Sequence, residues 1–201
     1  MNNYISVNGM QIELTEDQVN LIAYAYKKDQ IQLSEVATGD VFRMGDHEFI
    51  VLEQSGGTTA VIRKELLTDS RFGDTNNYFG SEVEHLCSKY ANEIEGIVGD
   101  GNIVKHTVDL TSNDGLKDYG TKDVRVSLLT ADQYRRYVEI LDKFKPDNWW
   151  WLSTPFSTKK HDNDFWVLCV SPSGCIDYYH YRGGIGVRPF CILKSTIFVS
   201  K

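Results

Sequence analysis

Hydrophobic and polar residues alternate over short stretches along most of this chain, which is the period of a β-strand that buries one face. Where such stretches are rich in β-branched and aromatic residues and lie between turn residues, they predict strands. Residues 39–63 repeat this pattern three times and predict an antiparallel meander. Further strands are predicted at residues 4–7, 11–14, 103–110, 124–129, 165–170, 175–181, 187–193 and 196–199.

Three other stretches have the spacing of a helix, and each follows a pair of residues typical of a helix start. In such a pair, each side chain accepts a hydrogen bond from the free backbone amide of the other residue. Together with the strands, these helices predict an α+β fold. The pairs are Thr15 with Gln18, Ser81 with Glu84 and Thr130 with Gln133.

The pattern also divides the chain into two parts. Residues 1–30 are predicted to form a small hairpin and helix, with Asn8 and Gly9 at the hairpin turn, and residues 31–201 to form the main domain. Within the main domain, residues 69–78 are predicted to be a polar loop. The glycine-rich residues 182–186 are predicted to be a flexible hairpin between strands.

The composition narrows the class of protein. Hydrophobic residues make up 41% of the 201 residues, which excludes a disordered chain. The 28 acidic and 21 basic residues give a formal charge of -7 at pH 7, which disfavours direct binding to nucleic acid or to an anionic membrane. The first residues lack the pattern of a signal peptide, and no apolar run is long enough to span a bilayer, so a cytoplasmic protein is expected.

Candidate metal ligands are few. His161, Asp162, Asp164 and His180 offer the imidazole and carboxylate groups that suit a divalent ion, but their spacing matches no closed site. A solvated loop is the favoured interpretation of residues 159–164, and no metal or cofactor is expected. The cysteines lack the paired spacing of a zinc site and are expected to be buried apolar side chains. They are Cys87, Cys169, Cys175 and Cys191.

Aromatic residues are concentrated in the last third of the chain, where all four tryptophans lie between Trp149 and Trp166. Neighbouring residues of a strand point to opposite faces, so Trp150 cannot share a side with Trp149 and Trp151. Packing in the core is favoured over ligand contact for each of them, and the side that Trp150 faces is left open. A recognition surface is predicted on residues 157–164 and 178–182, which alternate polar and aromatic groups. The candidate binding residues are Trp150, His161, Asp162, Asp164, Tyr178, Tyr179, His180, Tyr181 and Arg182.

Two charged features each have a structural and a functional interpretation. Arg188 precedes Pro189 and either binds a carboxylate of a partner or clamps the final strands through an internal bridge, which suits its planar guanidinium better. Acidic residues on two predicted helices could mimic a phosphate backbone in the channel of a nuclease, but an ordinary solvated helix face is favoured. They are Glu13, Glu16, Asp17, Glu82, Glu84, Glu93 and Glu95.

The segments Trp149-Trp150-Trp151-Leu152-Ser153-Thr154-Pro155 and Gly186-Val187-Arg188-Pro189-Phe190 resemble the WWLRSPG and GVRPAL motifs of an uncharacterised domain family of bacteriophages and Firmicutes. Ser153, Phe156 and the pair Phe190-Cys191 depart from those motifs. The resemblance implies a C-type-lectin-like or formylglycine-generating-enzyme-like fold, which is an α+β domain with two main helices and a twisted antiparallel sheet. Such a fold displays variable loops for binding. It implies no catalytic residue in this chain.

These observations leave three classes of function open. The first is a non-enzymatic protein of a phage or mobile element that recognises another protein, in its sharpest form an inhibitor of a bacterial defence system, such as an anti-CRISPR protein. The second is a virion or tail protein that binds a glycan or a host-surface protein through its aromatic loops. The third is a hydrolase or metal enzyme that uses His161 or His180. Protein recognition without catalysis is the favoured prediction, with a bacterial host protein as the partner.

Overall fold

The computed structural model describes residues 3–7, 9–19, 21 and 30–201. Near its N-terminus, β1 (Asn3–Val7) and β2 (Met10–Leu14) pair antiparallel in a two-stranded sheet of their own, as predicted. Residues 16–19 are helical, and Thr15 and Gln18 make both hydrogen bonds of the predicted helix start. The predicted continuation of that helix and Asn8 of the turn lie outside the described residues. The division into two domains at residue 30 stays a prediction.

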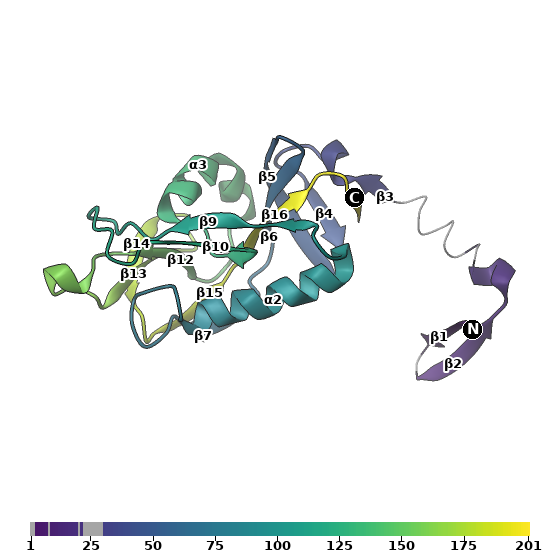
Figure 1. Ribbon diagram of the computed structural model, residues 1–201, viewed down its shortest axis with the longest axis horizontal. Coiled ribbons are helices and arrows are strands. Elements are labelled where there is room, and N and C mark those ends of the chain that lie inside the picture. Colours follow the sequence, from purple (N-terminus) through teal and green to yellow (C-terminus); the bar gives the residue numbers. More distant parts are fainter. Residues whose placement is uncertain (1–2, 8, 20, 22–29) are drawn as a thin grey trace.

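The larger of the two main sheets has eight strands and is built around the predicted meander (Figure 1). The turns of the meander use Gly45 and the pair Gly56-Gly57, which have the positive φ angles that glycine adopts without strain. The strand nearest the C-terminus, β17, returns to pair with β3, the first strand after residue 29. In sheet order the strands are β11 (Val126–Ser127), β16 (Phe190–Lys194), β6 (Thr58–Arg63), β5 (His47–Ser55), β4 (Val41–Met44), β17 (Phe198–Ser200) and β3 (Gln30–Gln32), and β8 (Ile103–Val104) also pairs with β16.

The second main sheet has five strands and contains the tryptophan-rich segment. Two of its strands correct the sequence analysis, because β7 lies in the predicted polar loop and β15 in the predicted flexible hairpin. β15 runs parallel to the tryptophan-rich strand and antiparallel to β7. In sheet order the strands are β14 (Ile176–His180), β13 (Trp166–Val170), β12 (Trp150–Pro155), β15 (Gly184–Val187) and β7 (Thr68–Arg71). A separate pair joins β9 (His106–Asp109) to β10 (Thr121–Val124), so the strand predicted at residues 124–129 is divided between β10 and β11.

The glycines of β15 serve close packing. A Cβ atom at Gly186 would lie 2.4 Å from Leu66 Cδ1 and 3.0 Å from the carbonyl oxygen of Trp149. The backbone amide of Gly186 donates to that same carbonyl oxygen at 2.8 Å. Glycine at this position therefore allows β15 to approach β12, and it does not make the segment flexible.

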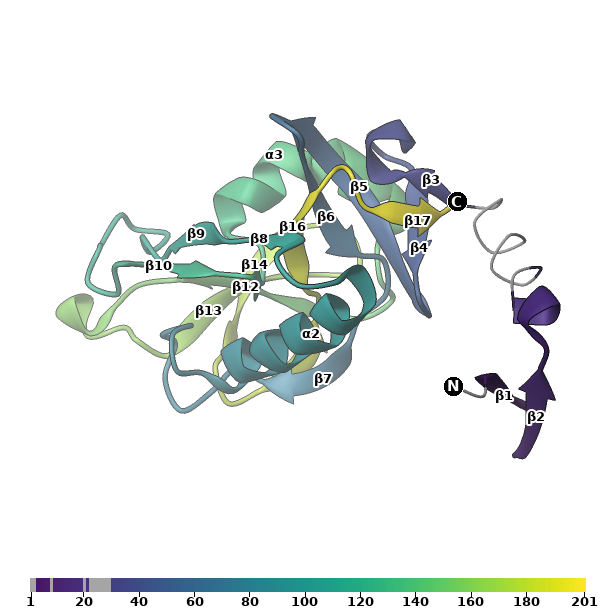
Figure 2. The same cartoon turned by 45° about the vertical axis from the view of Figure 1, so that its right-hand side comes forward.

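Two longer helices, α2 (Glu82–Val98) and α3 (Ala131–Leu141), lie on opposite sides of β12 and β13 (Figures 1 and 2). They confirm the predicted α+β class. Thr130 and Gln133 make both bonds of the predicted start of α3. At α2 the Ser81 hydroxyl accepts from the amide of Glu84 as expected, but the Glu84 carboxylate accepts from the amide of Gly80, at 2.6 Å. Single turns of 3-10 helix occur at η1 (Leu33–Glu35), η2 (Asp142–Phe144) and η3 (Lys159–His161).

Strand β12 is buried on both faces. The ring of Trp151 packs 5.4 Å from that of Phe72 in the core that α2 covers, and the ring of Trp150 packs 5.7 Å from that of Tyr134 in the core that α3 covers. Core packing was the favoured prediction for both tryptophans and is confirmed. Trp150 was also a candidate binding residue, but only 1% of it is exposed, so it contributes nothing to the surface.

Arg188 is a fully buried clamp, which confirms the structural interpretation of this residue. Its guanidinium donates hydrogen bonds of 2.8–3.0 Å to the backbone carbonyls of Arg63, Lys64 and Phe144. Burial lowers the pKa of Arg188 to about 10, so the group stays charged at neutral pH. Hydrogen bonds to three carbonyl oxygens and the contact with the face of the Trp150 ring stabilise this buried charge.

The cysteines are free thiols. Cys87, Cys169 and Cys191 are buried as predicted, whereas Cys175 is exposed, which corrects the expectation for that residue.

Among the helices of the described residues, none has both the length and the apolar character that crossing a membrane requires.

Candidate functional site

Five aromatic rings form a continuous row along one edge of the five-stranded sheet, and we call this row the aromatic ladder. Its members are Phe156, Tyr178, Trp166, His180 and Phe165. The centroids of successive rings lie 4.9, 5.5, 5.4 and 6.2 Å apart. Tyr178 and Phe165 are 48% and 46% exposed. A row of packed rings at the surface is the kind of feature that marks a recognition site.

Strand register brings the ladder together. Tyr178 and His180 are two residues apart on β14, so their side chains leave the same face of the sheet. Trp166 lies opposite His180 in the antiparallel pair of β13 and β14 and completes that face. Phe156 follows β12, and Phe165 precedes β13. The same face continues inward to Leu168 and Trp150 beneath α3, so the ladder is the part of this face that α3 leaves uncovered.

The chain's own side chains occupy part of the backbone edge at β14. β14 is the last strand of its sheet, and such an edge normally offers free backbone donors. Here the amide of Tyr178 donates to the Asp177 carboxylate at 2.8 Å, and just past the end of β14 the amide of Arg182 donates to Nδ1 of His180 at 3.2 Å. The second bond requires the His180 tautomer in which Nδ1 carries no proton. One donor of β14 and one donor of the turn that follows it are therefore occupied, while the side chains of the strand stay exposed for recognition.

A polar cluster around Asp114 holds the loop beside the ladder. The Asp114 carboxylate accepts from the hydroxyls of Ser112 and Ser157, and it lies 2.9 Å from Nδ1 of His161. Burial raises the pKa of Asp114, but the hydrogen bonds from Ser112, Ser157 and His161 outweigh it and lower that pKa to about 2. Thr158 donates to Asp118 in the same way. The loop of residues 157–164 is thus held by the carboxyl groups of Asp114 and Asp118 in the neighbouring loop.

This cluster does not have the geometry of a catalytic triad. In a triad the serine hydroxyl donates to the histidine, and the carboxylate orients the far side of that ring. Here the hydroxyl of Ser157 donates to the carboxylate itself. The neighbouring hydroxyls of Ser153 and Thr154 are occupied by backbone groups of Leu129 and Ala131. Within the described residues, no group of three or more His, Cys, Asp or Glu side chains is arranged to hold a metal ion.

The structure brings together only part of the predicted recognition surface. Tyr178 and His180 lie in the ladder, and Arg182 is exposed at its end, where its guanidinium covers the Tyr181 ring. Tyr181 is only 8% exposed, so its prediction as a surface residue is wrong. Tyr179 is exposed but points to the opposite face of the sheet, where it packs against Trp151.

The predicted loop residues lie beside the ladder and outside it. His161 and Asp162 are exposed and Asp164 is half-buried. Sequence reasoning missed Phe156, Phe165 and Trp166 as members of the site. The alternation of Trp166 with the buried residues of β13 could have identified Trp166. The contacts of these residues with β14, however, depend on the strand register, which cannot be read from the sequence.

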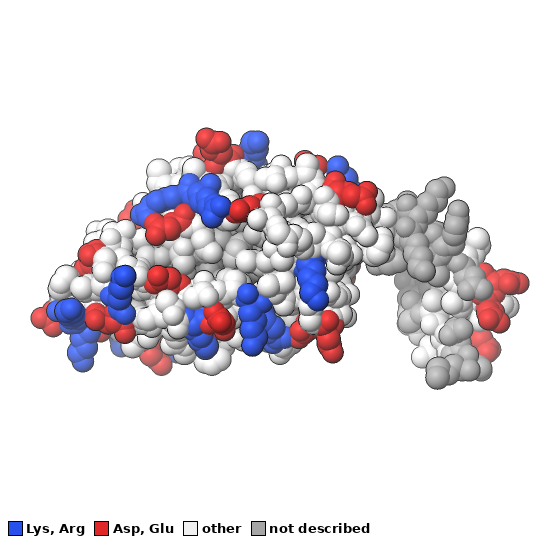
Figure 3. Space-filling view, turned by 45° about the horizontal axis from the view of Figure 1, so that its top comes forward, with Lys and Arg blue, Asp and Glu red and all other residues white. Residues whose placement is uncertain are grey.

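The acidic residues of α2 do not form a free negative face. Four of them are matched by a basic group from another element. Glu84 is buried and holds Lys122 at 2.6 Å, and the charges on the surface are of mixed sign (Figure 3). These pairings remove the feature that would have mimicked a phosphate backbone on this helix. The pairs are Glu82 with Arg71, Glu84 with Lys122, Glu93 with His47 and Glu95 with Arg125.

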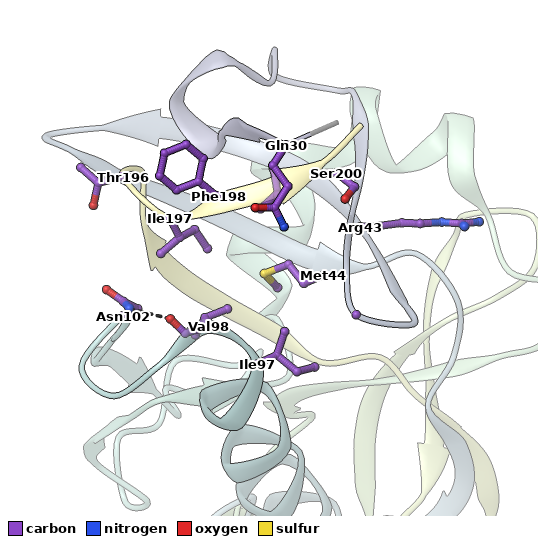
Figure 4. Close-up of a pocket in the computed structure, with 12 residues that line it drawn as sticks. Gln30, Arg43, Met44, Ile97, Val98, Asn102, Thr196, Ile197, Phe198 and Ser200 are labelled. Atoms are coloured by element: carbon purple, nitrogen blue, oxygen red, sulfur yellow. Dashed lines mark hydrogen bonds between the residues drawn. The ribbon is translucent and has the colours of Figure 1, made fainter. Parts of the chain in front are cut away.

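A recess lies between β17 and the end of α2, away from the aromatic ladder, and we call it the β17–α2 pocket. It has a volume of about 660 Å³. Met44, Ile97 and Ile197 face the space between the strand and the helix, whereas Arg43 points away from it (Figure 4). Asn102 closes the helix end by donating to the carbonyl of Val98. The pocket is lined mainly by aliphatic and amide groups and holds no catalytic constellation.

Comparison of the chain with protein-family models, with curated proteins and with solved structures finds no match.

Proposed function

We propose that this chain is a non-enzymatic binding protein that recognises another protein through the aromatic ladder. The observation that carries the proposal is the continuous row of five rings on a rigid sheet edge, with Tyr178 and Phe165 about half exposed. Aromatic side chains give a large contact area at a low cost in conformational entropy and dominate binding energy at protein interfaces. Because each of the three inner rings touches two others, removing one of them disturbs its neighbours too.

The ring geometry favours a protein partner over a glycan. A sugar stacks on the open face of an aromatic ring, so a glycan platform needs such a face turned to solvent. In the ladder, Trp166 meets Tyr178 at an interplanar angle of 71° and His180 at 86°. Phe156 is tilted by 54° from Tyr178, and Phe165 is stacked on His180 at 22°. The rings therefore meet at varied angles, which suits the irregular side chains of a protein surface better than the flat face of a sugar ring.

The sharpest form of the proposal is an inhibitor of a bacterial defence system, made by a phage or mobile element and acting in the host cytoplasm. Its support is the acidic character of the chain and the motif resemblance. Because the carboxylates of α2 are paired internally, this inhibitor would bind its target through the ladder and would not use that helix to imitate nucleic acid. The non-enzymatic part of the proposal is supported by the geometry of Ser157 and His161 around Asp114.

The test is an affinity capture from a bacterial host lysate with three baits. These are the wild-type chain, Tyr178→Ala and the matched control Tyr179→Ala, which removes an equally exposed tyrosine from the opposite face. We expect a protein that the wild-type chain and the control retain and that Tyr178→Ala retains at least roughly tenfold less, as for an interface residue worth 1.4 kcal/mol. Retention that is equal for all three baits, or retention of cell-wall glycan alone, contradicts the proposal.

A further inference from the structure

The described residues carry two apolar surfaces that are exposed to solvent, apart from the ladder. The first is one face of the β1–β2 hairpin. The register pairs Ile5 with Ile12, and Met10 and Leu14 lie two residues to either side of Ile12 on β2, so these four side chains leave the same face. Met10 is 66% exposed, and Ile12 is 44% exposed. An isolated two-stranded hairpin is marginally stable in water, so this face needs a cover.

The second uncovered surface is the β17–α2 pocket (Figure 4). Ile97 and Phe198 line it and are 43% and 61% exposed, although the elements that carry them are otherwise well packed. Phe198 alternates along β17 with Ile197 and Val199, which are buried. A phenylalanine at the outward position of a strand, beside a hollow of this size, is an exposed apolar patch without a partner.

The chain connects the two surfaces directly. Gln30, the first residue of β3, is itself part of the pocket wall. Residues 22–29 separate it from Leu21, and eight residues reach at most about 29 Å. A short covalent connection of this kind gives two surfaces an effective concentration in the millimolar range, which favours their contact even when the contact is weak.

We infer that the β17–α2 pocket is the docking site for the apolar face of the chain's own β1–β2 hairpin. In the docked form Met10 and Ile12 cover Ile97 and Phe198. This surface is separate from the aromatic ladder, so the inference does not depend on the proposed function.

The test is hydrogen exchange read by mass spectrometry on the full-length chain. Phe198→Asp and Met10→Asp each place a charge in one of the two surfaces. Both residues are exposed, so folding is not at risk, and urea denaturation checks this. Thr121→Asp adds the same charge at an exposed site outside both surfaces and is the matched control. Docking that is populated nine-tenths of the time slows exchange of the covered amides about tenfold.

We expect reciprocal effects. Phe198→Asp should speed exchange in the hairpin by roughly tenfold, Met10→Asp should speed exchange in residues 196–200 by a similar factor, and the control should change neither. Purely local effects of both variants overturn the inference. Sedimentation of the wild-type chain is expected to give a monomer, and a dimer that Met10→Asp dissociates would assign the hairpin to a second copy and overturn docking within one chain.

Discussion

The guanidinium carbon of Arg188 lies 5.3 Å from the centroid of the Trp150 ring, and both side chains are almost completely buried. The charge is balanced by backbone carbonyls that come from two distant segments, at Arg63 and Lys64 and at Phe144. One side chain, in the segment between β15 and β16, is therefore bonded to the last residue of β6, to the residue after it and to the last residue of η2. Arg188 is therefore a structural residue, and its buried guanidinium is not available to bind a partner protein.

Substitution of Arg188 should show this directly. Arg188→Met keeps an aliphatic stem but leaves three buried carbonyls without a donor, and we expect a loss of about 3 kcal/mol or more in the free energy of unfolding. Arg182→Met, which removes an exposed arginine that also covers an aromatic ring, should cost at most about 1 kcal/mol. Urea denaturation measures both. Similar losses in the two variants would contradict the clamp.

Two glycines of β15 provide a matched pair. Gly186→Ala forces a methyl group against Leu66 and the carbonyl of Trp149, and we expect it to cost about 1–3 kcal/mol. A Cβ atom at Gly184 meets nothing within 4 Å, so Gly184→Ala should be close to neutral. Thermal or urea unfolding distinguishes the two. If both variants were equally stable, β15 would not depend on its close approach to β12.

Because His106 is buried, we expect the free energy of unfolding to fall in mild acid. Burial lowers the pKa of His106 to about 4, and in the unfolded chain its pKa is near 6.5. Between these values the unfolded state binds a proton that the folded state does not, so stability falls as the pH drops from about 6.5 to 4. The total loss is on the order of 3 kcal/mol, at about 1.4 kcal/mol per pH unit.

The measurement is the urea midpoint at pH 7 and at pH 4.5 for the wild-type chain and for His106→Gln. The variant should lose much less stability between the two pH values. Its amide can still bond the hydroxyl of Ser127, which lies 2.9 Å from Nε2 of the histidine. The pKa of Asp114 is about 2 in the folded chain and about 3.9 in the unfolded chain, so the stability that it contributes is lost mainly below pH 4.5 and equally in both proteins. An equal loss in both proteins would assign the acid sensitivity to other groups.

The acidic residues should differ in what they contribute to stability. Glu84→Lys places a cation against Lys122 in a buried site and removes the acceptor of the Gly80 amide, so we expect a loss of about 3 kcal/mol or more. Glu16→Lys changes an exposed residue and should stay within about 0.5 kcal/mol. Chemical denaturation of the two variants tests this. A mild effect of Glu84→Lys would mean that the α2 carboxylate is free for a partner after all.

The sequence predicted local features of the fold well. Thr130 with Gln133 sets the start of α3, and glycines at the turns set the meander, because these features depend on residues a few positions apart. The sequence did not predict β7 and β15, since each pairs with a distant strand and has weak alternation of its own. Ser81 was recognised as a cap, but Glu84 bonds Gly80 and Lys122, which no local pattern indicates.

The candidate site was predicted less completely for the same reason. Tyr178 and His180 were predicted because polar and aromatic residues alternate over residues 178–182. The ladder itself exists because β13 places Trp166 beside them. Trp150 and Tyr181 are residue types that often occur in recognition surfaces, but both are buried, because Trp150 packs in the core beneath α3 and Tyr181 belongs to the core that α2 covers. Alternation along a strand indicates which residues share a face, and only the tertiary packing decides which end of that face is covered.

The Asp177 side chain, which occupies a backbone donor of β14, has a consequence for the behaviour of the protein at high concentration. An exposed strand with several aromatic side chains is usually a starting point for fibre growth, because successive copies can add through their backbones. Asp177 binds the amide of Tyr178, one of the donors that such an addition would use, and adds a charge that would repeat in every layer. We therefore expect this edge to oppose self-templated polymerisation while its aromatic rings stay in contact with water.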